Sequence, residues 1–183
     1  MLVNLRALLG SLIDLVLFRR GPETLPASPG VLAFVVALNA AVTALVVAFI
    51  PTVPAVTALE MLANAAVPLL WYWIAFSLAK KPERFVQTMS AFFGVNAIFQ
   101  PVVAPMFAAL LPYIQKPDPN VPPPAALSLL FLAITVWLLI VWVRIVHAAF
   151  EWPYAACILF VFAQNFAALY IFALLFGGAS GQV

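Results

Sequence analysis

Composition and charge restrict the class of this 183-residue chain before any motif is considered. Apolar side chains make up 67% of its residues and charged ones only 8%, whereas a soluble domain is about half apolar and about a quarter charged. A soluble protein of this kind would have too few polar side chains to cover its surface. The net charge of +2 includes no long basic run, so we expect no nucleic-acid partner. The composition predicts an all-α integral membrane protein.

Residues 1–20 predict an amphipathic helix and not a cleaved signal peptide. Leucines at positions 5, 8, 9, 12 and 15 share one side, while Asn4, Gly10, Ser11 and Asp14 share the other. Asp14 also interrupts the apolar stretch. Such a helix lies in the membrane interface or packs under the bundle, and both interpretations stay open. Residues 21–30 are expected to form a linker.

Five later stretches are each long enough to cross a bilayer core, which needs about 20 apolar residues. They cover residues 31–50, 56–79, 85–111, 126–146 and 154–176 of a membrane domain that spans 31–178. Pro51 and Pro54 are expected to end the first span. Residues 112–125 hold six of the 16 prolines and are predicted to form an extended external loop. The sequence therefore predicts a bundle of five transmembrane helices after the N-terminal amphipathic helix.

Positive charges predict the orientation, because Lys and Arg accumulate on the cytoplasmic side of a membrane. With five spans, seven of the eight basic residues fall at one end of the bundle, and only Lys116 falls at the other. The residues expected to set the topology or contact lipid headgroups are Arg19, Arg20, Lys80, Lys81 and Arg84. We expect a cytoplasmic N-terminus and an external C-terminus, in a bacterial inner membrane.

Amide side chains within the spans are the first candidates for a functional site, because polar groups are costly in lipid. Asn39, Asn96, Gln100, Gln164 and Asn165 lie on three spans near the middle of the bilayer. Amides at one depth can form interhelical hydrogen bonds, each worth about 0.6 kcal/mol. They can also line a polar pathway or a small-ligand site. We favour packing, because none of these groups ionises, and keep the pathway as the alternative.

Span three carries a stripe of small residues, Ser90, Gly94 and Ala97, that would let another helix approach closely. Pro101 continues this stripe and, with Pro68 and Pro105, is a potential kink point. Whether these prolines act as hinges or as static kinks stays open.

Arg144, His147 and Glu151 are spaced by three and four residues, so they are expected on one helical face. His147 is the only histidine, and one histidine with one carboxylate makes an incomplete metal site. No Ser or Cys motif stands beside it as a nucleophile. We interpret the three residues as an ionic face at the cytoplasmic end of span four. We expect no catalytic residue, no metal and no cofactor.

Two short segments and the overall layout carry a family resemblance. The segments are Phe18-Arg19-Arg20-Gly21-Pro22-Glu23, and Arg84-Phe85-Val86-Gln87-Thr88 continuing to Ala91-Phe92-Phe93-Gly94. They are similar to an uncharacterised group of proteobacterial inner-membrane proteins. An amphipathic helix followed by five spans resembles the Yip family of five-span membrane proteins and its bacterial members. The resemblance implies the fold and an inner-membrane location, and it implies no catalytic residue.

The leading functional hypothesis is a non-enzymatic accessory or scaffold subunit of a larger inner-membrane complex. Short loops and the lack of a midplane ionisable group favour it, and its partners would be membrane lipids and other membrane subunits. The alternative is a small-molecule or lipid transporter, or a lipid-handling protein, that uses the midplane amides. A membrane enzyme is the third hypothesis and depends on His147.

Overall fold

The described chain is almost entirely helical, and five of its helices could cross a membrane. The computed structural model describes residues 5–50, 56–115 and 121–176, and no strand occurs in those ranges. The helices are α1 (Leu5–Val16), α2 (Pro29–Phe49), α3 (Ala58–Leu78), α4 (Phe85–Gln115), α5 (Ala125–Phe150) and α6 (Tyr154–Phe176), with short 3-10 turns η1 (Pro22–Thr24) and η2 (Pro82–Arg84). Helices α2 to α6 are each long and apolar enough to cross a membrane. The predicted all-α architecture with five candidate spans is confirmed.

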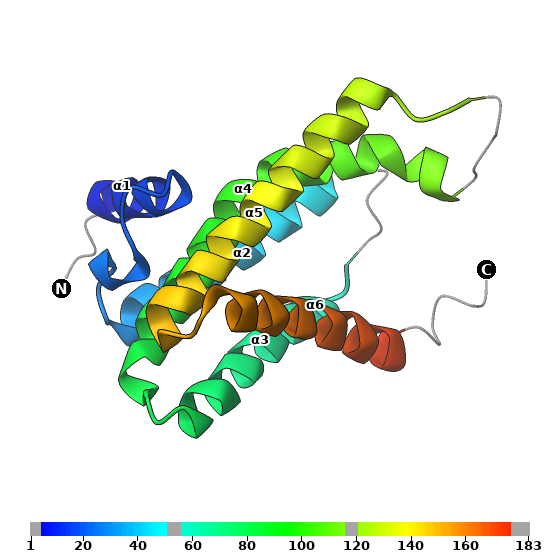
Figure 1. Cartoon of the computed structure of the whole chain (residues 1–183). Coiled ribbons are helices and arrows are strands. Elements are labelled where there is room, and N and C mark those ends of the chain that lie inside the picture. Colours follow the sequence, from blue (N-terminus) through cyan, green and yellow to red (C-terminus); the bar gives the residue numbers. More distant parts are fainter. Residues whose placement is uncertain (1–4, 51–55, 116–120, 177–183) are drawn as a thin grey trace.

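Helix α4 is the centre of the bundle. It contacts α1, α2, α3 and α5, and its residues from Thr88 to Val95 are all buried. Figure 1 shows α3 and α6, which contact each other, lying at an angle to α2, α4 and α5. The α3–α4 turn and the α5–α6 turn meet at one end of the molecule, which we call the basic end. The α3–α6 pair diverges from the other helices away from this end.

Two helices are longer than predicted, and the ends of other elements shift by a few residues. Helix α4 continues to Gln115, so residues 112–115 are helical and not part of the predicted proline-rich loop. A proline so close to a helix end leaves few hydrogen bonds after it to disturb. Helix α5 continues to Phe150 instead of 146, because side chains from the α3–α4 turn bind its last carbonyls. Pro51, Pro54, Lys116 and residues 177–178 lie outside the described residues.

Helix α1 packs against α4 through a face of buried leucines, Leu8, Leu12 and Leu15. A methyl group added to Gly94 of α4 would lie 2.5 Å from a terminal carbon of Leu12. At Gly94, the predicted small-residue stripe therefore receives the N-terminal helix. Leu9 and Ile13 of α1, and Leu17 directly after it, lie exposed on a neighbouring strip. Packing and contact with lipid are thus compatible, because they use different faces of the helix.

Candidate functional site

A cavity of about 360 Å³ lies inside the bundle and is lined by residues of all five long helices. We call it the amide cavity after its six amide side chains: Asn39, Asn64, Asn96, Gln100, Gln164 and Asn165. Five of these six are the predicted midplane amides, which the structure brings around one space. Aromatic side chains form much of the remaining wall: Phe92, Phe93, Phe99, Phe107, Trp142 and Phe172. None of the described lining residues is ionisable.

The amide cavity lies about half-way along the candidate spans. Asn39 and Gln164 are each ten residues from the first residue of α2 and α6 respectively, or about 15 Å at the helical rise. The hydrocarbon core of a bilayer is about 30 Å thick, so this depth is close to its middle. The lining continues to Phe107 and Phe172, further from the basic end. The cavity therefore extends toward the part of the molecule where α3 and α6 diverge from the other helices.

Part of the amide set joins neighbouring helices. Gln100 of α4 donates a hydrogen bond from Nε2 to Thr43 Oγ1 of α2 at 2.9 Å, and Thr43 donates to the backbone carbonyl of Asn39 at 2.9 Å. Trp142 of α5 donates from Nε1 to Asn96 Oδ1 of α4 at 3.2 Å. These bonds connect α2 to α4 and α4 to α5. They are interhelical packing contacts of the kind favoured from the sequence.

The remaining amides have more hydrogen-bonding capacity than the described protein satisfies. Gln164 is only 5% exposed, and its Oε1 has no hydrogen-bond partner. Asn165 donates from Nδ2 to the Val161 carbonyl of its own helix at 2.8 Å. Asn64 lines the cavity but is exposed on an apolar helix. Because buried polar atoms are nearly always paired, an occupant that forms hydrogen bonds would complete this site.

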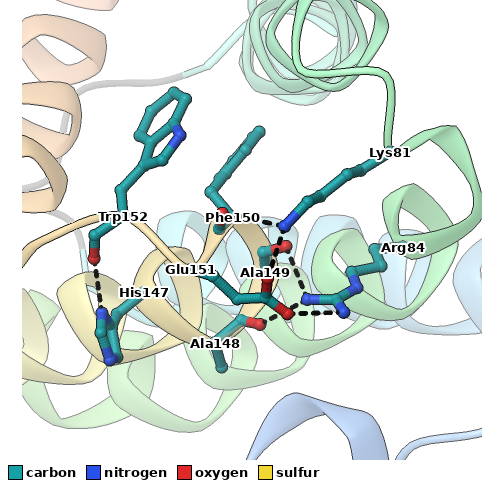
Figure 2. Close-up of polar contacts among 8 residues, drawn as sticks. All are labelled: Lys81, Arg84, His147, Ala148, Ala149, Phe150, Glu151 and Trp152. Carbon is teal, nitrogen blue, oxygen red and sulfur yellow. Dashed lines mark hydrogen bonds and ion pairs between the residues drawn. The ribbon is translucent and has the colours of Figure 1, made fainter.

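At the basic end, Lys81, Arg84 and Glu151 form an ionic clasp between the two turns (Figure 2). Lys81 Nζ lies 2.8 Å from Glu151 Oε2, and Arg84 Nη2 lies 2.7 Å from Glu151 Oε1. The same two cations donate to carbonyls in the last turn of α5, those of Ala148, Ala149 and Phe150, at 3.1 Å each. Helix ends leave such carbonyls unpaired and partly negative, so the cations stabilise this end of α5.

The clasp lowers the pKa of its carboxyl group. Hydrogen bonds from Lys81 and then Arg84, together with their charges, hold the pKa of Glu151 below its ordinary value. Glu151 has φ of 62°, a left-handed conformation that ends α5 and turns the backbone off the helix. Its side chain therefore leaves the face of α5 and reaches the α3–α4 turn.

The structure brings the predicted ionic face together only in part: Arg144 and His147 line one pocket, while this turn directs Glu151 toward Lys81 and Arg84. The guanidinium of Arg144 lies 4.8 Å from the centre of the Phe18 ring. His147 Nδ1 lies 2.7 Å from the Trp152 carbonyl, which only accepts, so Nδ1 carries the hydrogen. The three side chains thus have three different partners, although Arg144 and His147 line the same pocket.

The other predicted headgroup residues divide between ion pairs and solvent. Arg20 lies 3.3 Å from the Asp14 carboxylate and Arg19 lies 3.9 Å from it. Both arginines also line a pocket of about 300 Å³ at the basic end, together with Arg144. Lys80 is exposed in the α3–α4 turn. The predicted basic residues therefore gather at one end, although Lys81 and Arg84 hold helices together there.

Sequence reasoning missed two features of these sites. Asn64 is an amide in an otherwise apolar stretch, and the rule that selected the other five amides would have found it. The capping box of α3, in which Thr57 and Glu60 bond each other's backbone N–H groups, was also missed. Thr57 followed three residues later by Glu60 was the available signal.

Neither similarity to known proteins nor a cluster of metal-ligating side chains adds a described residue to the candidate site. No protein-family model, curated protein or solved structure matches this chain. Within residues 5–50, 56–115 and 121–176, no three His, Cys, Asp or Glu side chains gather as they would around a metal ion. The candidate site therefore rests on the amide cavity and on the geometry around it.

Proposed function

We propose that this chain is a multi-pass membrane protein that binds a small or lipid-like molecule in the amide cavity, without catalysing a reaction on it. The observation that carries the proposal is Gln164, which is almost fully buried against the cavity with an unpaired carbonyl oxygen. Polar side chains inside a membrane bundle are expensive and commonly mark a ligand path. A space of about 360 Å³ with aromatic walls and a few polar groups is typical of a ligand site.

The proposal is tested by the molecules that stay with the protein during purification. We expect one or more species to be enriched over the bulk membrane extract in wild-type preparations. Asn96→Leu and Asn165→Leu remove two amides of the cavity and should lose this enrichment while remaining folded. Thr135→Val removes a polar group of α5 that is not among the described lining residues, so it is the matched control. Equal enrichment in all four proteins, or none in the wild type, would contradict the proposal.

A second candidate function, an accessory subunit of a larger membrane complex, is favoured by a groove on α3 and α6. The groove has a volume of about 560 Å³ and is mostly apolar, and Trp71, Leu78 and Trp152 are among its lining residues. The indole Nε1 of Trp71 is buried, and no described residue forms a hydrogen bond with it. A helix of another subunit could fill this groove. Purification in mild detergent at native expression should then retain a stoichiometric partner, and Ala75→Phe should release it.

The location proposed for the chain is a bacterial inner membrane, with the basic end in the cytoplasm. Five apolar helices support a membrane location, and the gathering of arginines and lysines at one end supports this orientation. The resemblance to five-span proteins of the Yip family agrees with the same location. The family resemblance and the inner-membrane location both remain part of the proposal.

A further inference from the structure

The chemistry of the amide cavity restricts what it can hold. We propose that its ligand is an uncharged amphiphile with a free hydroxyl group, such as a diacylglycerol. This inference rests on the proposed function and names its ligand class. It follows from the charge of the lining, from the balance of donors and acceptors, and from the aromatic wall.

The charge of the lining excludes a phosphate or carboxylate headgroup. None of the described lining residues is ionisable, and the cavity lies near the middle of the candidate spans. A charged group brought to this depth would lose its hydration without gaining a counter-charge, which is strongly unfavourable. Lys81 and Arg84 are about 15 Å away along the helices and already bind Glu151. The polar part of the ligand is therefore uncharged.

The balance of donors and acceptors selects a ligand that donates. Gln164 Oε1 lacks a donor. Asn165 uses one N–H of its amide on the Val161 carbonyl, so its carbonyl oxygen remains as an acceptor and its second N–H as a donor. Asn96 Oδ1 accepts one bond from Trp142 and can accept a second. A ketone or an ester only accepts and would leave these oxygens unpaired, whereas a hydroxyl group both donates and accepts.

The aromatic wall and the volume of the cavity indicate the apolar part of the ligand. Phe107 and Phe172 line the part of the cavity furthest from the basic end, where α3 and α6 diverge. An apolar chain attached to the hydroxylated group can lie along this wall. About 360 Å³ holds a small headgroup and the start of its chains, so the chains must continue out of the cavity. A membrane lipid with a small hydroxylated headgroup fits both parts.

The inference is tested with three photoactivatable probes that share the same acyl chains. They are a diacylglycerol, its 3-O-methyl ether, which lacks the donor, and the corresponding phosphatidic acid, which is charged. The purified full-length chain is placed in phosphatidylcholine nanodiscs with a small mole fraction of each probe. Labelling is measured by intact mass after illumination, and peptide mapping locates it. We expect the diacylglycerol to label residues of the cavity about tenfold more than either other probe, the usual effect of losing one buried hydrogen bond.

Variants show whether Gln164 is responsible. Gln164→Leu should lower diacylglycerol labelling to the level of the methyl ether, while Thr135→Val should not change it. Asn165→Leu, at an exposed position, is the second variant should Gln164→Leu fail to fold.

Equal labelling by the ether, or stronger labelling by phosphatidic acid, overturns the inference. Phosphatidic acid labelling that Gln164→Leu abolishes would leave the proposed function intact while excluding an uncharged ligand. No labelling by any probe also overturns the inference, and the extract comparison then decides the proposed function separately.

Discussion

Phe18, Lys80 and Glu151 adopt the left-handed backbone conformation, with φ of 62°, 55° and 62°. Each of them ends a helix near the basic end, at a position where glycine is the usual residue. The side chains of Phe18 and Glu151 form contacts that a glycine could not form. Phe18 stacks on Trp137, and Glu151 forms the ionic clasp. Lys80 differs, since its side chain is exposed and forms no ion pair within the described chain.

Lys80→Gly is therefore expected to stabilise the protein. The backbone N–H groups of Lys80 and Lys81 bond the carbonyls of Ser77 and Phe76, which is the arrangement that a glycine at this position favours. Removing the side chain should relieve about 1 kcal/mol of left-handed strain and raise the midpoint of thermal unfolding in detergent. Lys80→Ala is the control, because it removes the charge and keeps the strain. An equal rise in both variants would attribute the effect to charge instead.

Glu151 makes the ionic clasp sensitive to acid. Its pKa is held below the ordinary value in the folded protein by Lys81 and Arg84. The clasp therefore contributes fully above the unfolded pKa of about 4.3, and its contribution is lost as the pH falls through the lower folded pKa. Glu151→Gln should lower the thermal midpoint at pH 7. The gap between wild type and variant should close as the pH falls below about 4. A gap that stays constant over this range would contradict a carboxylate role.

At the scale of elements, the docking of α1 on α4 depends on the absence of a side chain at Gly94. Gly94→Ala would place a methyl group against Leu12, which is 1% exposed and has little room to move. We expect a loss of about 1–3 kcal/mol of stability, as for other overpacked sites. Thermal unfolding measures this loss, and Leu12→Ala combined with Gly94→Ala should recover part of it. Gly10→Ala on α1 is the matched control, because nothing lies within 4 Å of the added carbon.

The elements themselves were largely predictable, because about 20 apolar residues in a row have few alternatives to a long helix. The residues at which the helices begin and end were harder to predict. The last turn of α5 depends on Lys81 and Arg84, which lie more than 60 residues away in the chain. A run of apolar residues contains no information about such a partner. The end of α4 was predicted too early for a similar reason. The composition of the proline-rich segment does not show how far α4 continues before the loop.

The candidate site could be predicted in its members but not in its pairings. Asn39, Asn96 and Gln164 stand out because each is a polar residue in an apolar span, and all three line one cavity. Which atoms pair depends on how each helix is rotated about its axis. Trp142 bonds Asn96, while Gln164 Oε1 stays unpaired. The spacing of residues along the chain does not fix this rotation, so it was insufficient to predict the pairings.

At the scale of the whole molecule, side-chain contacts hold the basic end together, whereas α3 and α6 diverge from the other helices away from it (Figure 1). The ionic clasp and the aromatic stack of Phe76 on Phe150, at 4.3 Å, hold the α3–α4 and α5–α6 turns together. The amide cavity begins about half-way along the spans and extends toward the diverging ends of α3 and α6. A ligand would therefore enter from the bilayer half opposite the clasp. If the basic end is cytoplasmic, that half is the outer leaflet.

The orientation can be tested with single cysteines at the two ends, because the native Cys157 is buried and gives little background. Val121 is exposed at the end opposite the clasp, and Lys80 is exposed at the basic end. With the basic end in the cytoplasm, a membrane-impermeant maleimide added to intact spheroplasts should label Val121→Cys and not Lys80→Cys. Lysis should make both accessible, which controls for the reactivity of each thiol. The reverse pattern would place the basic end outside, contrary to the tendency of Lys and Arg to remain cytoplasmic, and would make the amide cavity accessible from the inner leaflet.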